Sequence, residues 1–312
     1  MVDVSTSLTS IPALHPSARN LGRHTVLCGL EADPSLFRPC NLRQRLIALD
    51  QLDTAFGAFA PQQSTTLTDS RIYQRANALR ARLEAVNADL YQSLRSAILQ
   101  GSQPPTLSHW LQYPAPSNHS QIPTPGMDFD WRDELLSGVL QLPEPNQPEE
   151  QYWQRASEMV PYQPTPVRHI LHLLAATALT QEDVFVDLGS GLGHVPLMVS
   201  MMTKARSLGV EVQPAYVASA QQCAQSLHLS RVEFLSRDAR EADMSGGTVF
   251  YLYSPFKGSI LTAVLNALRR EAAHRPIKIC SLGPCTRTLA NQTWLKARTL
   301  PDTRHITLFN SQ

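Results

Sequence analysis

Strand-like and helix-like segments alternate from Val167 to the end of this 312-residue chain, and this alternation constrains the fold more than any other feature. Short apolar runs rich in β-branched and aromatic residues recur at residues 184–188, 207–212, 231–236, 248–254 and 276–282. Segments with helical periodicity lie before and between them, at residues 167–179, 193–205, 214–227 and 257–272. Such alternation predicts a mostly parallel sheet with helices on both faces. The last two runs, 293–299 and 305–311, are separated by only five residues, which predicts an antiparallel C-terminal hairpin at the edge of a seven-stranded α/β sheet.

The N-terminal third has a purely helical periodicity. Apolar residues recur at steps of three and four from Leu42 to Phe56, and a longer series runs from Ile72 to Ile98. Each series forms one apolar stripe, so we expect two helices that pair antiparallel within a helical N-terminal domain at residues 21–103. Two uses of the stripes stay open, namely packing within the chain and a homodimer formed through these helices. Residues 1–20 are polar and interrupted by proline, which predicts a flexible tail.

Proline dominates the next segment. Residues 104–166 hold 12 of the 23 prolines, which predicts a connector at residues 104–160 without long regular elements. Residues 127–142 inside it have the pattern of a short helix that carries Phe129 and Trp131. This helix is expected to pack against its neighbours, with a lid over the active site as the alternative. The α/β domain then occupies residues 161–312.

Composition excludes several classes of protein. The formal net charge is +1 and no dense basic stripe is visible, so no nucleic-acid partner is expected. No run approaches the roughly 18 apolar residues of a membrane span, and the N-terminus lacks a secretory signal, which predicts a cytoplasmic protein without a membrane partner. The five cysteines form no C-x-x-C pair. His169 and His172 lie three residues apart on a predicted helix, but no acid or cysteine stands at ligand spacing, so we expect no metal.

The stretch FVDLGSGLGHV, residues 185–195, points to a ligand. A strand followed by a glycine turn and a helix presents backbone N–H groups at the carboxyl edge of a sheet, where α/β proteins bind nucleotides. Gly189, Gly191 and Gly193 are spaced G-x-G-x-G, whereas NAD-binding folds favour G-x-G-x-x-G. Asp187 would repel a pyrophosphate but suits a ligand that carries an ammonium or a sulfonium group. An NAD-dependent oxidoreductase is therefore the weaker alternative.

Two further acids end the neighbouring predicted strands. Glu211 follows the second strand and is placed to accept hydrogen bonds from both hydroxyls of a ribose. Asp238 follows the third strand, where its carboxylate can accept from the amino group of an adenine while the Ala239 N–H faces a ring nitrogen. Together these residues outline an adenosine with a charged tail.

These motifs resemble those of the class I S-adenosylmethionine (SAM) dependent methyltransferases, which have a Rossmann-like fold. DLGSGLG at 187–193, which includes Ser190, is similar to their first motif, and GVEV at 209–212 and SRDA at 236–239 are similar to their ribose and adenine segments. Within the superfamily, the non-SET histone lysine methyltransferases and small bacterial members are the most similar. YQPTP at 162–166 resembles the Y-x-P-T-P segment of bacterial members, which implies that Tyr162 and Thr165 reach the methionine end of SAM. The resemblance covers residues 160–312 and implies SAM as the cofactor.

The resemblance is weaker at the fourth strand, where amine and amide methyltransferases often carry Asn/Asp-Pro-Pro-aromatic. This chain has Tyr253, Ser254, Pro255 and Phe256 instead. Tyr253, Ser254 and Phe256 are the candidates for positioning the acceptor. We expect methyl transfer by in-line displacement to an O or N atom, with a small-molecule acceptor favoured by the long N-terminal part that can enclose the site. The alternatives are a SAM-binding regulator or scaffold without catalysis and a protein-lysine methyltransferase.

Overall fold

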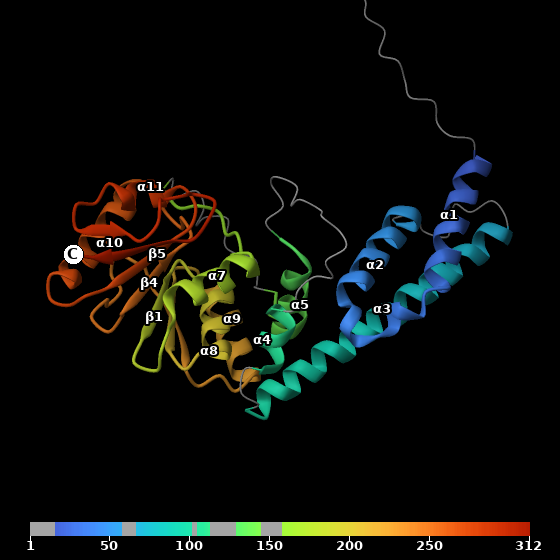
Figure 1. The fold of residues 1–312 in the computed structure, drawn as a ribbon, viewed down its shortest axis with the longest axis horizontal. Helices are drawn as coiled ribbons and strands as arrows, with labels where there is room; N and C mark the ends of the chain where they lie inside the picture. Colours follow the sequence, from blue (N-terminus) through green and yellow to red (C-terminus); the bar gives the residue numbers. More distant parts are fainter. Residues whose placement is uncertain (1–15, 58–66, 102–104, 113–128, 145–157) are drawn as a thin grey trace, which may run out of the picture. The chain divides into compact units, whose positions relative to one another are not determined.

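The computed structural model describes residues 16–57, 67–101, 105–112, 129–144 and 158–312, which divide into two compact units at Leu90 (Figure 1). The helices are α1 (Pro16–Glu31), α2 (Leu42–Phe56), α3 (Leu67–Leu99), α4 (Pro105–Gln112), α5 (Trp131–Leu140), α7 (Val167–Thr177), α8 (His194–Met202), α9 (Pro214–Ser226), α10 (Gly258–Ala272) and α11 (Cys285–Ala290). The strands are β1 (Val184–Leu188), β2 (Arg206–Glu211), β3 (Val232–Ser236), β4 (Val249–Leu252), β5 (Lys278–Ser281), β6 (Leu295–Ala297) and β7 (Thr307–Ser311). None of these described helices combines the length and apolarity that a membrane crossing requires.

In the N-terminal unit, α2 and α3 pair antiparallel, as predicted. The Phe56 ring lies edge-on to Tyr73 with centroids 5.6 Å apart, whereas Arg45, near the other end of α2, donates to Asn87 Oδ1 at 2.6 Å. The C-terminal end of α2 therefore lies beside the N-terminal part of α3, and the N-terminal part of α2 lies farther along α3, as in an antiparallel pair. Leu52 and Leu83 are buried in the shared core, so the apolar stripes are used within the chain.

The sequence-based reading of residues 1–20 as a tail is wrong at its C-terminal end, because α1 begins at Pro16. Its helical pattern is weak, and tertiary contacts support it instead. Leu27 is buried in the core that α1 shares with α2 and α3, and Arg23 Nε donates to Ala55 O at 2.8 Å. Residues 1–15 lie outside the described part of the chain.

The second unit contains a seven-stranded sheet in the order β3-β2-β1-β4-β5-β7-β6. Strands β1 to β5 are parallel, and β7 runs antiparallel to both β5 and β6. The predicted α/β fold and its C-terminal edge hairpin are confirmed. Because the chain leaves β1 in one direction and returns to β4 on its other side, the strand order reverses between β1 and β4, and α/β sheets bind ligands at that point.

Helices cover both faces of the sheet, as Figure 1 shows. Right-handed crossovers on opposite sides of β1 place α8 and α9 on one face and α10 on the other. Leu261, Val264 and Leu268 of α10 are buried in the main core with Val186 and Phe250 of the strands.

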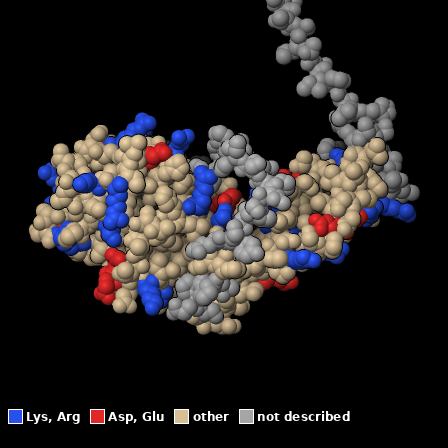
Figure 2. Space-filling model, in the orientation of Figure 1, with Lys and Arg blue, Asp and Glu red and all other residues tan. Residues whose placement is uncertain are grey.

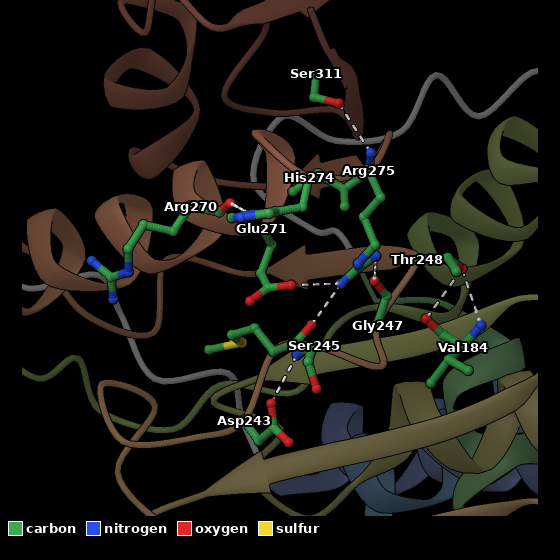
Figure 3. Close-up of polar contacts among 12 residues, drawn as sticks. Val184, Asp243, Ser245, Gly247, Thr248, Arg270, Glu271, His274, Arg275 and Ser311 are labelled. Atoms are coloured by element: carbon green, nitrogen blue, oxygen red, sulfur yellow. Dashed lines mark hydrogen bonds and ion pairs between the residues drawn. The ribbon is translucent and has the colours of Figure 1, made fainter.

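The amino edge of the sheet is closed by structural contacts. Arg275, just after α10, donates to the carbonyl groups of Gly247 and Met244, the latter at 2.8 Å (Figure 3). Thr248 Oγ1 accepts from the Val184 N–H at 3.0 Å. These bonds hold the loop between β3 and β4 in place, so the polar groups of this edge have a structural role.

The Pro-rich connector contains more helix than predicted. Pro105 stands at the first position of α4, where a proline costs no hydrogen bond, and Leu107 and Leu111 are buried. Helix α4 itself was not predicted, but with eight residues it is compatible with a connector that has no long regular elements. Residues 113–128 and 145–157 of the connector lie outside the described residues.

Helix α5 packs against other helices, although Phe129, one of the two aromatic residues expected to pack, is 44% exposed. Its Asp133 accepts from the Val167 N–H at the start of α7, at 2.8 Å. The end of α5 and the segment after it bind α9, since Cys223 Sγ donates to Leu140 O at 3.2 Å and Ser219 Oγ donates to Pro143 O at 2.7 Å. None of residues 129–144 lines the cavity described below, and the lid stays an untested alternative.

Candidate functional site

A cavity of about 300 Å³ opens at the carboxyl edge of the sheet, where the strand order reverses. Its wall includes most of the residues that the sequence analysis singled out: Tyr162, Thr165, Asp187, Gly189, Ser190, Glu211, Asp238, Ala239, Tyr253, Ser254 and Phe256. Gly191 and Gly193 lie in the same turn but are not part of the wall. Residues 158–166, here called the strap, cover one side of the cavity.

The glycine turn is held by close contacts with neighbouring segments. Gly189, Gly191 and Gly193 all have positive φ, at 86°, 53° and 79°. A Cβ on Gly189 would lie 2.3 Å from Pro255, and one on Gly191 would lie 2.1 Å from the Tyr162 ring. The glycines are therefore required by backbone conformation and by packing together.

The N–H groups of this turn are not free for a ligand, which corrects the sequence-based expectation. Gly189 and Ser190 both donate to Val210 O, at 2.8 and 3.0 Å, and Gly193 donates to Ser190 O at 2.9 Å. The Gly191 N–H donates to Glu211 Oε2 at 2.9 Å. The turn thus shapes the cavity and offers few donors for an anion.

Glu211 joins the turn to the start of α9. Its second oxygen, Oε1, accepts from the Gln213 N–H at 2.9 Å. The residue is 8% exposed and faces the cavity. Burial raises the pKa of Glu211, while its bonds to Gln213 and Gly191 oppose the rise. Each carboxylate oxygen can accept a further hydrogen bond, which suits the predicted contact with a ribose.

Asp187, in contrast, has no hydrogen-bond donor among the described residues. It is 3% exposed and lies between Gly209 of β2 and Tyr251 of β4 in the strand register. Burial, and then the nearby Glu211, raise the pKa of Asp187 well above its usual range. A buried carboxylate without a partner is costly, so this position is built for a ligand that donates or carries positive charge.

Asp238 binds its own neighbour. Arg240 donates to it through the guanidinium group at 2.6 and 3.0 Å and through the backbone N–H at 2.9 Å, which keeps the pKa of Asp238 below its usual value. Asp238 is therefore paired with Arg240, which lies two residues after it. Ala239 lies in the cavity wall, and its N–H makes no hydrogen bond within the described part of the chain.

The strap brings Tyr162 and Thr165 to the cavity. Tyr162 Oη lies 3.0 Å from His194 Nδ1, and its ring centroid lies 5.3 Å from that of Tyr216. Thr165 Oγ1 lies 3.1 Å from Tyr251 Oη, deep in the wall. Burial lowers the pKa of His194 to about 4, so this histidine is neutral near pH 7.

The end of β4 contributes three candidate acceptor residues with different surroundings. Ser254 Oγ donates to Leu282 O at 3.0 Å and accepts from the Cys285 N–H at 2.9 Å, so its hydroxyl ties β4 to the β5 end. Ser254 also has a φ of 42°. Phe256 is buried in the main core as well as lining the cavity. Tyr253 alone presents a hydroxyl without a hydrogen bond among the described residues.

Several cavity residues were not found from the sequence. Tyr216 and Gln213 belong to α9 and its N-cap, and only the position of Gln213 directly after β2 signals the carboxyl edge. Tyr251 carries the strand pattern of a core residue. His169 is buried in the cavity wall, with its ring 6.3 Å from that of His305. Among the described residues no group of three or more potential ligands is arranged to hold a metal ion.

The residues present fit SAM. Asp187 and Glu211 face the cavity without a cation, and Ser190 Oγ and Gln213 Nε2 are buried in its wall without a hydrogen-bond partner. Unsatisfied acceptors and donors of this kind are expected where a polar, positively charged nucleoside belongs. When bound, SAM supplies a methyl group on a sulfonium, which needs no further activation.

Comparisons with known proteins agree with this assignment. Residues 143–247 match the family described as histone methylation protein DOT1, a stretch that contains β1, α8, β2, α9 and β3. No curated protein matches the chain.

Solved structures of methyltransferases are similar to about half of the chain. An RNA methyltransferase from Salinibacter ruber, in complex with S-adenosyl-L-homocysteine, is 26% identical over 48% of this chain and 92% of that chain, with a TM-score of 0.39. A precorrin-6y C5,15-methyltransferase from Geobacter metallireducens is 15% identical over 49% and 92%, with a TM-score of 0.37. An rRNA methylase from Streptococcus thermophilus is 15% identical over 48% and 96%, with a TM-score of 0.34.

The family match spans the strands that carry the glycine turn and its three acids. Together with a strand order that reverses beside β1, it identifies the chain as a class I SAM-dependent methyltransferase.

Proposed function

We propose that the protein transfers the methyl group of SAM to an oxygen or nitrogen atom of a small molecule that reaches the cavity beside β4. One observation supports this proposal above the others, namely that one cavity contains the two cation-free carboxylates, at the ends of β1 and β2, and the Tyr253 and Phe256 side chains, beyond the end of β4. Nucleoside and acceptor would then meet in the same enclosed space.

These two groups of residues have separate tasks in this proposal. Glu211 binds the ribose hydroxyls, Asp187 faces the charged tail, and Asp238 with Ala239 binds the adenine. Tyr253 and Phe256 orient the acceptor, while Ser254 holds their loop in place. Alignment and exclusion of water can contribute about 7–11 kcal/mol to such a displacement, so no catalytic dyad is required.

The volume of the cavity limits the size of the acceptor group that can enter it. Small-molecule sites usually span about 300–1,000 Å³, and this one lies at the lower end of that range. A nucleoside with an amino-acid tail fills much of it, so only the reacting part of the acceptor enters. On the face of the molecule in Figure 2, Lys and Arg are dispersed over the surface, and no broad basic patch for a nucleic acid gathers there.

Isothermal titration with SAM tests the cofactor assignment. We expect micromolar binding, and at least a tenfold loss of affinity in Asp187→Ala and in Glu211→Ala. Binding that is unchanged in both variants would contradict the assignment of these residues.

Incubation with labelled SAM and fractionated cell extract tests the acceptor. Label in the small-molecule fraction is expected, whereas label in protein would support a protein-lysine methyltransferase instead. SAM binding without any transfer in these fractions would favour the regulator or scaffold.

A further inference from the structure

Asp187 and Glu211 share the cavity without a compensating cation. They end adjacent strands, and among the described residues neither forms an ion pair. Arg237 and Arg304 line the same cavity but are exposed to solvent, and Arg304 lies 4.0 Å from Asp302. The third acid of the wall, Asp238, is already paired with Arg240. The negative charge of the two buried acids is therefore left for a ligand to balance.

Neutral groups face the two acids from the other elements. Tyr162 of the strap and Tyr216 of α9, here called the aromatic corner, are tilted by 56° with ring centroids 5.3 Å apart. Both rings line the same cavity as Glu211. Gln213 links the corner to this acid, because its N–H donates to Glu211 Oε1 at 2.9 Å and its carbonyl accepts from the Tyr216 N–H at 3.1 Å. Tyr251 of β4 is paired with Asp187 in the strand register, and Nδ1 of the neutral His194 lies 3.0 Å from Tyr162 Oη. None of these groups supplies a positive charge at neutral pH.

The methyl donor and its product differ in charge. SAM carries an ammonium, a sulfonium and a carboxylate, for a net charge of +1, whereas S-adenosylhomocysteine (SAH) has lost the sulfonium and is neutral overall. Aromatic faces attract such cations, and buried carboxylates are strongly unfavourable until a cation or a proton neutralises them. Both features of this cavity favour the charged ligand.

Building on the proposed function, we propose that Asp187, Glu211 and the aromatic corner select the charged donor over the neutral product, with Tyr216 as a further cofactor-binding residue. Transfer of the methyl group removes the sulfonium charge and leaves the two acids with one cation fewer. Product then leaves more readily than donor.

The selection depends on pH. Burial raises the pKa of Asp187, so this acid holds a proton as the pH falls, and the advantage of the charged donor disappears. As the pH rises, the proton is lost in the SAH complex, while the sulfonium still balances the acid in the SAM complex. The preference for SAM over SAH therefore grows with pH.

Titration of the full-length protein with SAM and SAH at pH 6, 7 and 8 tests the proposal. We expect SAM to bind at least tenfold more tightly than SAH at pH 8, and the ratio of the two affinities to fall at pH 6. Equal affinities throughout would overturn the proposal. A wild-type protein that binds neither compound would instead overturn the proposed function itself.

Variants separate this proposal from an Asp187 that binds only the ammonium group common to both compounds. In Asp187→Asn the ratio of SAM to SAH affinity should fall several-fold and become less dependent on pH, because Glu211 and the aromatic corner remain. An equal loss of affinity for both compounds, with the wild-type ratio kept, would overturn the proposal. Melting curves identify variants that fail to fold. The pH series with the wild-type protein tests the proposal even if a variant does not fold.

The aromatic corner has its own pair of variants. Tyr216→Leu should weaken SAM several-fold more than SAH, whereas Tyr216→Phe keeps the ring and should retain the ratio. Glu233→Gln removes an exposed acid of β3 that is outside the cavity and serves as the matched control. If Tyr216→Leu leaves the ratio unchanged, Tyr216 has no part in the selection.

Discussion

The two halves of the cavity differ in chemistry. The half at the ends of β1, β2 and β3, the acidic half, contains all the carboxylates that line the cavity among the described residues: Asp187, Glu211 and Asp238. The half at the ends of β4 and β5, here called the acceptor half, presents Tyr253, Phe256 and Leu282. The difference teaches that binding of a charged nucleoside and placement of an acceptor are separate tasks, so changes in one half should leave the task of the other unaffected.

The largest expected effect comes from Gly191→Ala in the acidic half. The substitution forces a non-glycine residue to a φ of 53° and pushes Cβ into the Tyr162 ring, which adds about 1–3 kcal/mol of strain. We expect SAM affinity to fall by about a hundredfold in isothermal titration. Gly246→Ala is the matched control, because nothing lies within 4 Å of its added Cβ. Equal SAM affinity in both variants would show that the glycine turn tolerates a side chain at residue 191, and would contradict this prediction.

Tyr253→Phe should affect only the acceptor half of the cavity. Removal of the free hydroxyl is expected to lower the rate of methyl transfer about tenfold, as loss of a positioning hydrogen bond of 1–2 kcal/mol would. SAM affinity should remain that of the wild type. A variant that loses SAM affinity instead would place Tyr253 in the nucleoside site and remove the distinction between the halves.

The acidic half also predicts a pH dependence of stability. Because the folded pKa of Asp187 is raised, its contribution is fully present below the usual aspartate value near 3.8 and is lost as the pH rises through the folded value. The melting temperature of the ligand-free protein should therefore fall by a few degrees from pH 5 to pH 8. Asp187→Asn should flatten this decline, and a melting temperature that falls equally in the variant would assign it to other groups.

The smallest effect is expected for Asp238→Asn. Asp238 is partly exposed and paired with Arg240, and such pairs contribute about 0–1 kcal/mol. Stability in urea should change by no more than this amount, and SAM affinity should fall only several-fold. A loss as large as that of Glu211→Ala would make Asp238 an equal partner in binding.

The sequence predicted the α/β unit well because periodicity and strand-end acids are local signals. Asp187 and Glu211 lie at the carboxyl ends of β1 and β2, and Asp238 follows β3. Parallel strands bring these ends together at one edge. Helix α1 was missed because its few apolar residues, such as Leu27, acquire their role only against α2 and α3.

Other features of the site depend on contacts between distant segments. The Gly191 N–H is taken by Glu211, the Ser254 hydroxyl by Leu282 and Cys285, and no spacing reveals either partner. Tyr216 has the pattern of an ordinary helix residue, and its role follows from the strap that carries Tyr162 across to it. Predictions from sequence succeeded where the signals lie within regular helices and strands, and they missed individual contacts between distant segments.

A crystal structure of the protein with SAH tests the central claim most directly. The account predicts the sugar within hydrogen-bond distance of Glu211, the amino-acid tail beside Asp187, and an open space between the sulfur and Tyr253. A nucleoside bound elsewhere, with both acids still turned into an empty cavity, would contradict it.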